Sequence, residues 1–219
     1  MKLVTYRQGS GAERSGALVD NGNTIVDLLE ASSALHGSNG LPALGNIQSL
    51  IEGGDEALDA ASKAVLKANK SARLERAAVT LLAPLQPPPQ MRDCLCFEGH
   101  LIQAGRNAPF IHGTGDSSAA KPVAETLDLS RAPETFYNQP IYYKANRFAV
   151  VGTDHDVIWP NYSTIMDFEL EFGIYIKKRA KDISKENAHE YIFGYTILND
   201  FTARDAQFAE MAGYLGPAK

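Results

Sequence analysis

The sequence lacks any hydrophobic run approaching the roughly 18 residues that a membrane-spanning helix needs, so we expect no membrane span. We also expect no signal peptide, because its first residues, MKLVTYRQGSG, follow the pattern of a short strand. Its only cysteines, Cys94 and Cys96, lie too close together in the sequence for a useful disulfide. These absences predict a cytoplasmic protein with reduced thiols.

The sequence also lacks an excess of positive charge, with 21 Lys and Arg against 26 Asp and Glu. The net charge of the 219 residues is −5, which argues against a nucleic-acid or membrane-surface partner. Neither an internal repeat nor a low-complexity tract is present. With 44% hydrophobic residues, the composition is that of a globular protein with one large domain or two small ones.

The strand and helix patterns of residues 1–83 predict a small β-rich domain. Asn21–Gly22 suits a hairpin turn between the second and third of three short strand patterns, KLVTYR, SGALVD and TIVDLL. Residues 47 to about 74 follow a helical pattern with a break at Gly53–Gly54. A proline-rich stretch follows, and it indicates an extended linker that we place at residues 84–90.

Residues 91–219 predict a second domain. Residues 105–130 are rich in Gly, Ala and Ser and show no clear period, so we expect a mobile loop there. Strand patterns follow in QPIYYKAN, FAVVGTD, IMDFELEFGIYI and GYTILND. The last segment, FTARDAQFAEMAG, reads as a helix in which Thr202 is the N-cap and Asp205 completes a capping box.

The strand pattern IMDFELEFGIYI carries three acids on one face, Asp167, Glu169 and Glu171, opposite a face of apolar side chains. Carboxylates two residues apart on a strand lie about 7 Å apart. At an effective dielectric constant near 20 they repel by about 2 kcal/mol. A cation between Glu169 and Glu171 would turn this repulsion into shared attraction. The alternative is a solvated strand, on which alternating glutamates are common.

Two aspartates extend this candidate metal site. Asp200 ends a strand pattern just before a helix, and Asp93 precedes the apolar stretch CLCF. Oxygen ligands without Cys or His favour a hard cation, Mg²⁺ or Ca²⁺, with Mn²⁺ as a further candidate. Taken alone, Asp200 also fits a turn or a helix cap. His100, seven residues after Asp93, fits either a half-buried polar side chain or a general base beside such a site.

The order of these motifs resembles the fumarylacetoacetate hydrolase family. P-x-Y-Y-K is followed by DFELE, then by YTILNDFTARDAQ and GYLGPAK, and the likeness covers roughly residues 90–219. The resemblance implies a mainly β fold with some helix, in which a small N-terminal β-rich domain precedes a β-roll catalytic domain of the fumarylacetoacetase type. It also implies a homodimer of the full-length protein.

The resemblance further implies a role for each candidate residue. His100 would be the general base that activates water. Four residues would hold the divalent cation, namely Asp93, Glu169, Glu171 and Asp200. Four would contact the substrate, namely Tyr143, Lys144, Arg204 and Gln207.

The reaction that the resemblance implies is hydrolysis of a C–C bond in a 1,3-dicarbonyl acid of the fumarylacetoacetate or acylpyruvate type. Decarboxylation, hydration or isomerisation of a 2-oxo acid is the alternative within the family, and the substrate decides between them. The family's remaining strands, a lysine after the Gly-Pro segment and a glutamate partner of the histidine do not occur in these residues, although Glu98 is a substitute partner. We therefore expect a truncated catalytic domain with little or no activity, or a non-catalytic fragment.

Overall fold

The computed structural model describes residues 1–219 except residue 38, residues 113–129 and residues 213–219. The chain divides into two compact units. The first contains Met1–Pro89, Arg147–Asp156 and Phe172–Ile197, and the second contains Gln90–Asn146, Val157–Glu171 and Leu198–Lys219. Among the described residues, no helix combines the length and the apolar character that crossing a membrane requires. The domain limits predicted from the sequence stay a prediction.

A five-stranded antiparallel sheet organises the first unit, with the strand order β4-β3-β2-β1-β5. Its strands are β1 (Lys2–Arg7), β2 (Glu13–Val19), β3 (Thr24–Asp27), β4 (Arg73–Glu75) and β5 (Thr80–Leu82). The predicted hairpin is confirmed, since Val19 of β2 pairs with Thr24 of β3. Asp20, Asn21 and Gly22 in its loop all have positive φ angles, of 51°, 55° and 89°.

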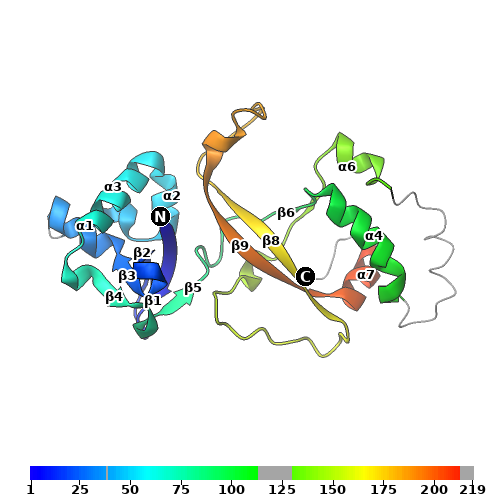
Figure 1. The fold of residues 1–219 in the computed structure, drawn as a ribbon, viewed down its shortest axis with the longest axis horizontal. Coiled ribbons are helices and arrows are strands. Elements are labelled where there is room, and N and C mark those ends of the chain that lie inside the picture. The colour runs from blue at the N-terminus through cyan, green and yellow to red at the C-terminus, as the bar shows by residue number, and fades with distance from the viewer. Residues whose placement is uncertain (38, 113–129, 213–219) are drawn as a thin grey trace. The chain divides into compact units, whose positions relative to one another are not determined.

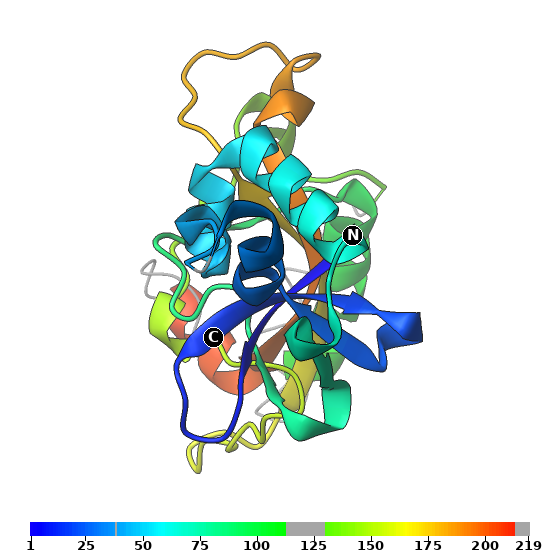
Figure 2. The same cartoon turned by 90° about the vertical axis from the view of Figure 1, so that its left-hand side faces the viewer.

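Three helices supply most of the core on one face of this sheet (Figures 1 and 2). They are α1 (Leu28–His36), α2 (Ile47–Glu52) and α3 (Gly54–Leu66). The predicted break at Gly53–Gly54 is confirmed, but the helical segment ends earlier than predicted. The predicted strand TIVDLL is also too long, because Asp27 accepts a hydrogen bond from the Glu30 amide at 2.8 Å and so begins α1.

The opposite face of the sheet holds a buried polar cluster around Asp27. The Tyr6 hydroxyl and the Arg14 guanidinium both donate to its carboxylate. Burial raises the pKa of Asp27, but the hydrogen bonds from Arg14, the Glu30 amide and Tyr6 outweigh it, so the pKa is lowered. Asp27 is therefore a charged structural residue that joins the sheet to α1.

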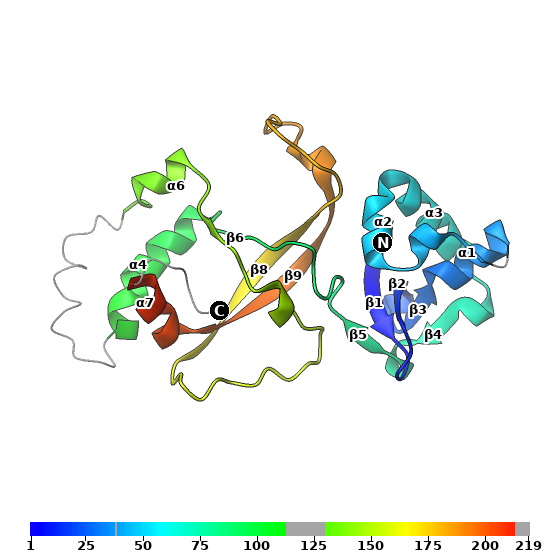
Figure 3. The same cartoon turned by 180° about the vertical axis from the view of Figure 1, so that it is seen from behind.

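In its described residues, the second unit contains two short strands, parts of two long strands and three helices. The strand β6 (Asp93–Cys94) pairs with β7 (Tyr142–Tyr143), and β8 (Met166–Ile176) pairs with β9 (Ile192–Ala203). Parts of β8 and β9 belong to the first unit. The helices are α4 (Glu98–His112), α6 (Glu134–Asn138) and α7 (Arg204–Ala212), of which α4 and α7 lie side by side (Figures 1 and 3). Short 3₁₀ turns occur at Asp20–Gly22, Pro42–Leu44, Lys70–Ala72, Arg76–Ala78, Arg147–Ala149 and Ala188–Tyr191.

Several predictions for this part were wrong. Residues 105–112 belong to α4 rather than to a loop, and the remainder of the predicted loop up to residue 129 lies outside the described residues, as does GYLGPAK. The segment FAVVGTD forms no strand and begins in a 3₁₀ turn. β9 runs past Asp200 to Ala203, so Asp200 lies within a strand and the buried Thr202 is not the N-cap of α7.

The predicted strand at residues 165–176 is confirmed as β8, and its side chains alternate in exposure along the whole strand. The apolar side chains form the more exposed face, with Leu170 exposed at 77%. The acids form the more buried face, where the side chain of Glu169 is exposed at only 15%. The acidic face is therefore not a simple solvated surface.

Candidate metal centre

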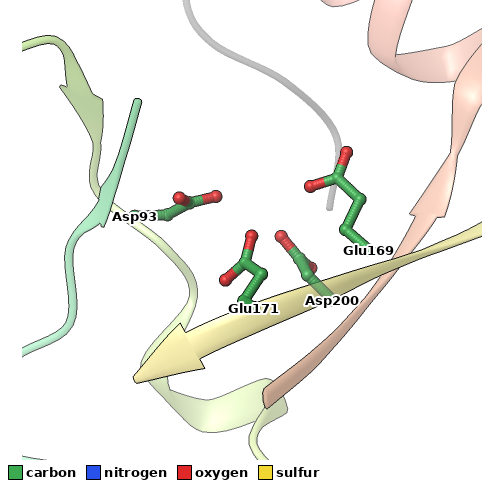
Figure 4. Close-up of side chains that lie close together, drawn as sticks. All are labelled: Asp93, Glu169, Glu171 and Asp200. Atoms are coloured by element: carbon green, nitrogen blue, oxygen red, sulfur yellow. The ribbon is translucent and has the colours of Figure 1, made fainter. Parts of the chain in front are cut away.

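The structure brings the four predicted metal ligands together. Each of them offers one carboxylate oxygen, and these four atoms lie within 4.8 Å of one another. Figure 4 shows the carboxylates of Asp93, Glu169, Glu171 and Asp200 pointing toward a common centre. All four residues are partly buried, which limits screening by water. That they bind a metal stays a prediction.

Three elements supply these side chains. Glu169 and Glu171 share one face of β8 because side chains alternate along a strand, and Asp200 lies on β9, the partner strand of β8. Asp93 comes from β6, in a different two-stranded sheet. The convergence therefore depends on the placement of two separate sheets.

The electrostatics of the group favour a cation. Two unit charges at 4.8 Å repel by about 3 kcal/mol at an effective dielectric constant near 20. The donor set consists entirely of carboxylate oxygens, which are the ligands that hard divalent cations prefer. The residues present thus fit Mg²⁺, Mn²⁺ or Ca²⁺.

Arg204 is paired with acids of β8. Its Nε donates to Asp167 Oδ2 at 2.7 Å, and its Nη1 donates to Glu169 Oε1 at 2.6 Å and to Gln207 Oε1 at 2.9 Å. Burial raises the pKa of Asp167, but hydrogen bonds from Arg204 and the Phe168 amide outweigh it and lower the pKa. Arg204 thus offsets part of the repulsion along β8, a role that was not predicted from the sequence. A substrate contact of Arg204 or Gln207 stays a prediction.

Tyr143 lies directly beside the carboxylates. Its hydroxyl donates to Asp200 Oδ2 at 2.7 Å. Burial raises the pKa of Tyr143, and hydrogen bonding to Asp200 and Asp93 raises it further. The phenol is therefore a neutral donor toward these anions. Lys144, the next residue, is exposed, and its predicted substrate contact stays a prediction.

His100 lies in the first turn of α4 and is exposed. Within the described part of the chain, the convergent group contains the four acids and does not include His100. Glu98, the substitute partner suggested by the sequence, accepts a hydrogen bond from the Tyr137 hydroxyl. The role of His100 as a base stays a prediction.

Part of the chain matches a known protein family. Residues 112–219 match the family described as Fumarylacetoacetate (FAA) hydrolase C-terminal. Residues 112–219 belong to the fumarylacetoacetate hydrolase family. The family predicted from the order of the motifs is thereby confirmed.

Two curated relatives match nearly the whole chain. Oxaloacetate tautomerase YisK of Bacillus subtilis is 27% identical, with 92% of this chain and 60% of YisK covered. The mitochondrial oxaloacetate tautomerase fahd2 of Xenopus laevis is 26% identical, with 94% of this chain and 54% of fahd2 covered. The chain thus spans little more than half the length of these curated relatives.

A solved structure of the family supports the fold. Maleylpyruvate hydrolase from Sphingobium sp. SYK-6, in complex with manganese(II) and pyruvate, matches with a TM-score of 0.57 at 20% identity. The match covers 93% of this chain and 60% of that protein. The predicted fold class, a sheet-rich fold with helices of the fumarylacetoacetase type, is confirmed by this likeness.

Asp205, in the family's Asn-Asp-x-Thr-Ala-Arg-Asp segment, anchors α7 to the loop before β8. Its carboxylate accepts hydrogen bonds from Ser163 Oγ at 2.5 Å and from the Thr164 amide at 2.8 Å. The predicted capping box with Thr202 is therefore wrong. The hydrogen bonds from Ser163 and Thr164 lower the pKa of Asp205 from 3.8 to about 2.

We expect Asp205→Asn to lower the melting temperature at pH 7. Because the folded-state pKa is lowered, the charged carboxylate stabilises the fold above the unfolded value of 3.8, and this contribution is lost as the pH falls toward about 2. The difference between wild type and variant should shrink over that interval in thermal unfolding curves. Asp182→Asn, which changes an acid whose side chain is 85% exposed, is the control. A difference independent of pH would contradict the assignment.

Proposed function

We propose that the protein is a divalent-cation-dependent enzyme that hydrolyses a C–C bond in a 1,3-dicarbonyl acid of the fumarylacetoacetate or acylpyruvate type. The observation that carries this proposal is the convergence of four carboxylates from β6, β8 and β9 within 4.8 Å. A bound divalent cation would supply Lewis-acid polarisation of a substrate carbonyl. The manganese(II) in maleylpyruvate hydrolase supports a cation of this class.

The side chains of this protein would transfer the proton and bind the anionic oxygens of the substrate. His100 would take a proton from water while the water oxygen adds to a carbonyl carbon. The C–C bond then breaks, its electron pair leaves as an enolate, and the proton returns to the enolate carbon. Arg204 and Lys144 would bind the anionic oxygens of the substrate, with Tyr143 and Gln207 as neutral contacts.

Keto–enol tautomerisation of a 2-oxo acid is a second candidate function. The observation that favours it is that the two tautomerases match 92% and 94% of this chain. Tautomerisation moves a proton between carbon and oxygen and breaks no C–C bond. It would use the same carboxylates and would need no attacking water.

One assay separates the two functions. The protein as its natural gene encodes it should be incubated with Mn²⁺ or Mg²⁺ and either an acylpyruvate or the enol form of oxaloacetate. C–C hydrolysis predicts loss of the acylpyruvate with one equivalent of pyruvate formed, whereas tautomerase activity predicts faster decay of the enol without cleavage. EDTA should abolish either activity. Activity that survives EDTA, or no activity on either substrate, would contradict the proposal.

The oligomeric state is a separate proposal. We propose a homodimer of the full-length protein, on the resemblance to the family alone. Light scattering during size-exclusion chromatography tests it, and a monomer at micromolar concentration would contradict it.

A further inference from the structure

Tyr143 occupies a defined position between two of the four acids. It stands directly opposite Asp93 in the register of the antiparallel pair β6–β7. Residues directly opposite each other in such a pair project their side chains to the same face, with Cβ atoms about 5 Å apart. Tyr143 and Asp93 therefore share a face, while Tyr142 and Cys94 share the other.

The hydroxyl of Tyr143 reaches across to the other sheet. It donates to Asp200 Oδ2 at 2.7 Å, and Asp200 belongs to β9, the partner strand of β8. One side chain thus connects the strand that opposes Asp93 with the strand that carries Asp200. Because β6 and β7 are only two residues long, their own pairing gives Asp93 little rigidity.

We propose that Tyr143 is a positioning residue for the metal centre, acting through Asp200 and Asp93. This inference rests on the proposed function, because it assumes that the acids bind a cation. A carboxylate that accepts one hydrogen bond keeps lone pairs for a metal, while the bond fixes the rotation of the group. The same bond fixes β7 relative to β9 and so brings Asp93 to Glu169, Glu171 and Asp200. This role is additional to the substrate contact that the resemblance to the family implies for Tyr143.

The test is the affinity of the purified chain for Mn²⁺, measured by calorimetry. Tyr143→Phe keeps the ring and removes the hydroxyl, and we expect the affinity to fall about 10- to 100-fold, as for other residues that orient metal ligands. Tyr142→Phe is the matched control, since it makes the same change on the other face of the same strand, and its affinity should be unchanged. Equal affinities for wild type and Tyr143→Phe would overturn the inference.

A double-variant comparison tests whether Tyr143 acts through Asp200. If it does, Tyr143→Phe should weaken Mn²⁺ binding much less in an Asp200→Asn background than in wild type. The same fold-loss in both backgrounds would overturn this route. Failure of wild type itself to bind Mn²⁺ would instead contradict the proposed function, so the two failures can be told apart.

A measurement on the wild-type chain keeps the inference testable if Tyr143→Phe does not fold. Labelling tyrosine with ¹³C at Cζ reports on the hydrogen bond of each phenol. Addition of diamagnetic Mg²⁺ should shift the Tyr143 signal, because the carboxylate that accepts its hydrogen bond becomes a metal ligand. The signal of Tyr142, which is 51% exposed, should stay in place. A Tyr143 signal that does not move while Mg²⁺ binds would overturn the inference.

Discussion

Replacing Glu171 by Gln should lower the affinity of the protein for Mg²⁺ or Mn²⁺ on the order of 100-fold or more. The substitution preserves the shape of the side chain but removes one formal charge from a group whose oxygens lie within 4.8 Å of one another. An amide oxygen also attracts a hard cation less strongly than a carboxylate oxygen does. Isothermal titration of the purified chain measures the loss directly.

Asp167→Asn is the matched control for this experiment. It removes the same charge from the same face of β8, but Asp167 pairs with Arg204 and is not among the four convergent acids. We expect its effect on metal affinity to be about 10-fold at most, because it acts only through the local field. Unchanged affinity in Glu171→Gln would contradict the assignment. Equal losses in the two variants would show a general charge effect instead of ligation.

The local pattern of the sequence predicted β8 well, because period-two alternation over eleven residues depends only on the strand itself. The same pattern placed Glu169 and Glu171 on one face. The pattern did not predict the ion pair between Asp167 and Arg204, because Arg204 lies 37 positions further along the chain. The alternation of acids along β8 predicted a cation that offsets their repulsion, whereas in the structure the Arg204 guanidinium offsets part of it.

Contacts that depend on the placement of separate elements were less predictable. Asp93 was a weak candidate from its neighbours alone, because its position results from the pairing of β6 with β7. In that pair Asp93 lies opposite Tyr143, which is 50 positions further along the chain. The resemblance to the family strengthened this prediction. Residues 105–112 of helix α4 were predicted as a loop because they show no apolar period. The sequence pattern predicted that the last strand ends at Asp200. In the structure β9 continues to Ala203, and Thr202 and Ala203 are buried.

The catalytic prediction with the largest expected effect concerns His100. In the natural protein, His100→Ala should lower turnover by about 10²- to 10⁴-fold, because the reaction would lose the group that takes the proton from water. Affinity for the cation should stay close to that of wild type, because His100 is exposed on α4 and is not among the four convergent acids. Steady-state kinetics and Mn²⁺ calorimetry on the same preparation measure the two quantities.

The matched control is His189→Ala. His189 lies in the 3₁₀ turn Ala188–Tyr191, where its Nδ1 contacts the backbone oxygen of Glu186 at 2.7 Å, so its loss should leave turnover unchanged. A loss of both turnover and metal affinity in His100→Ala would indicate damage to the metal centre and not the loss of a base. Near wild-type turnover would remove His100 from the mechanism, and it would leave tautomerisation, which needs no activated water, as the better account of the four carboxylates.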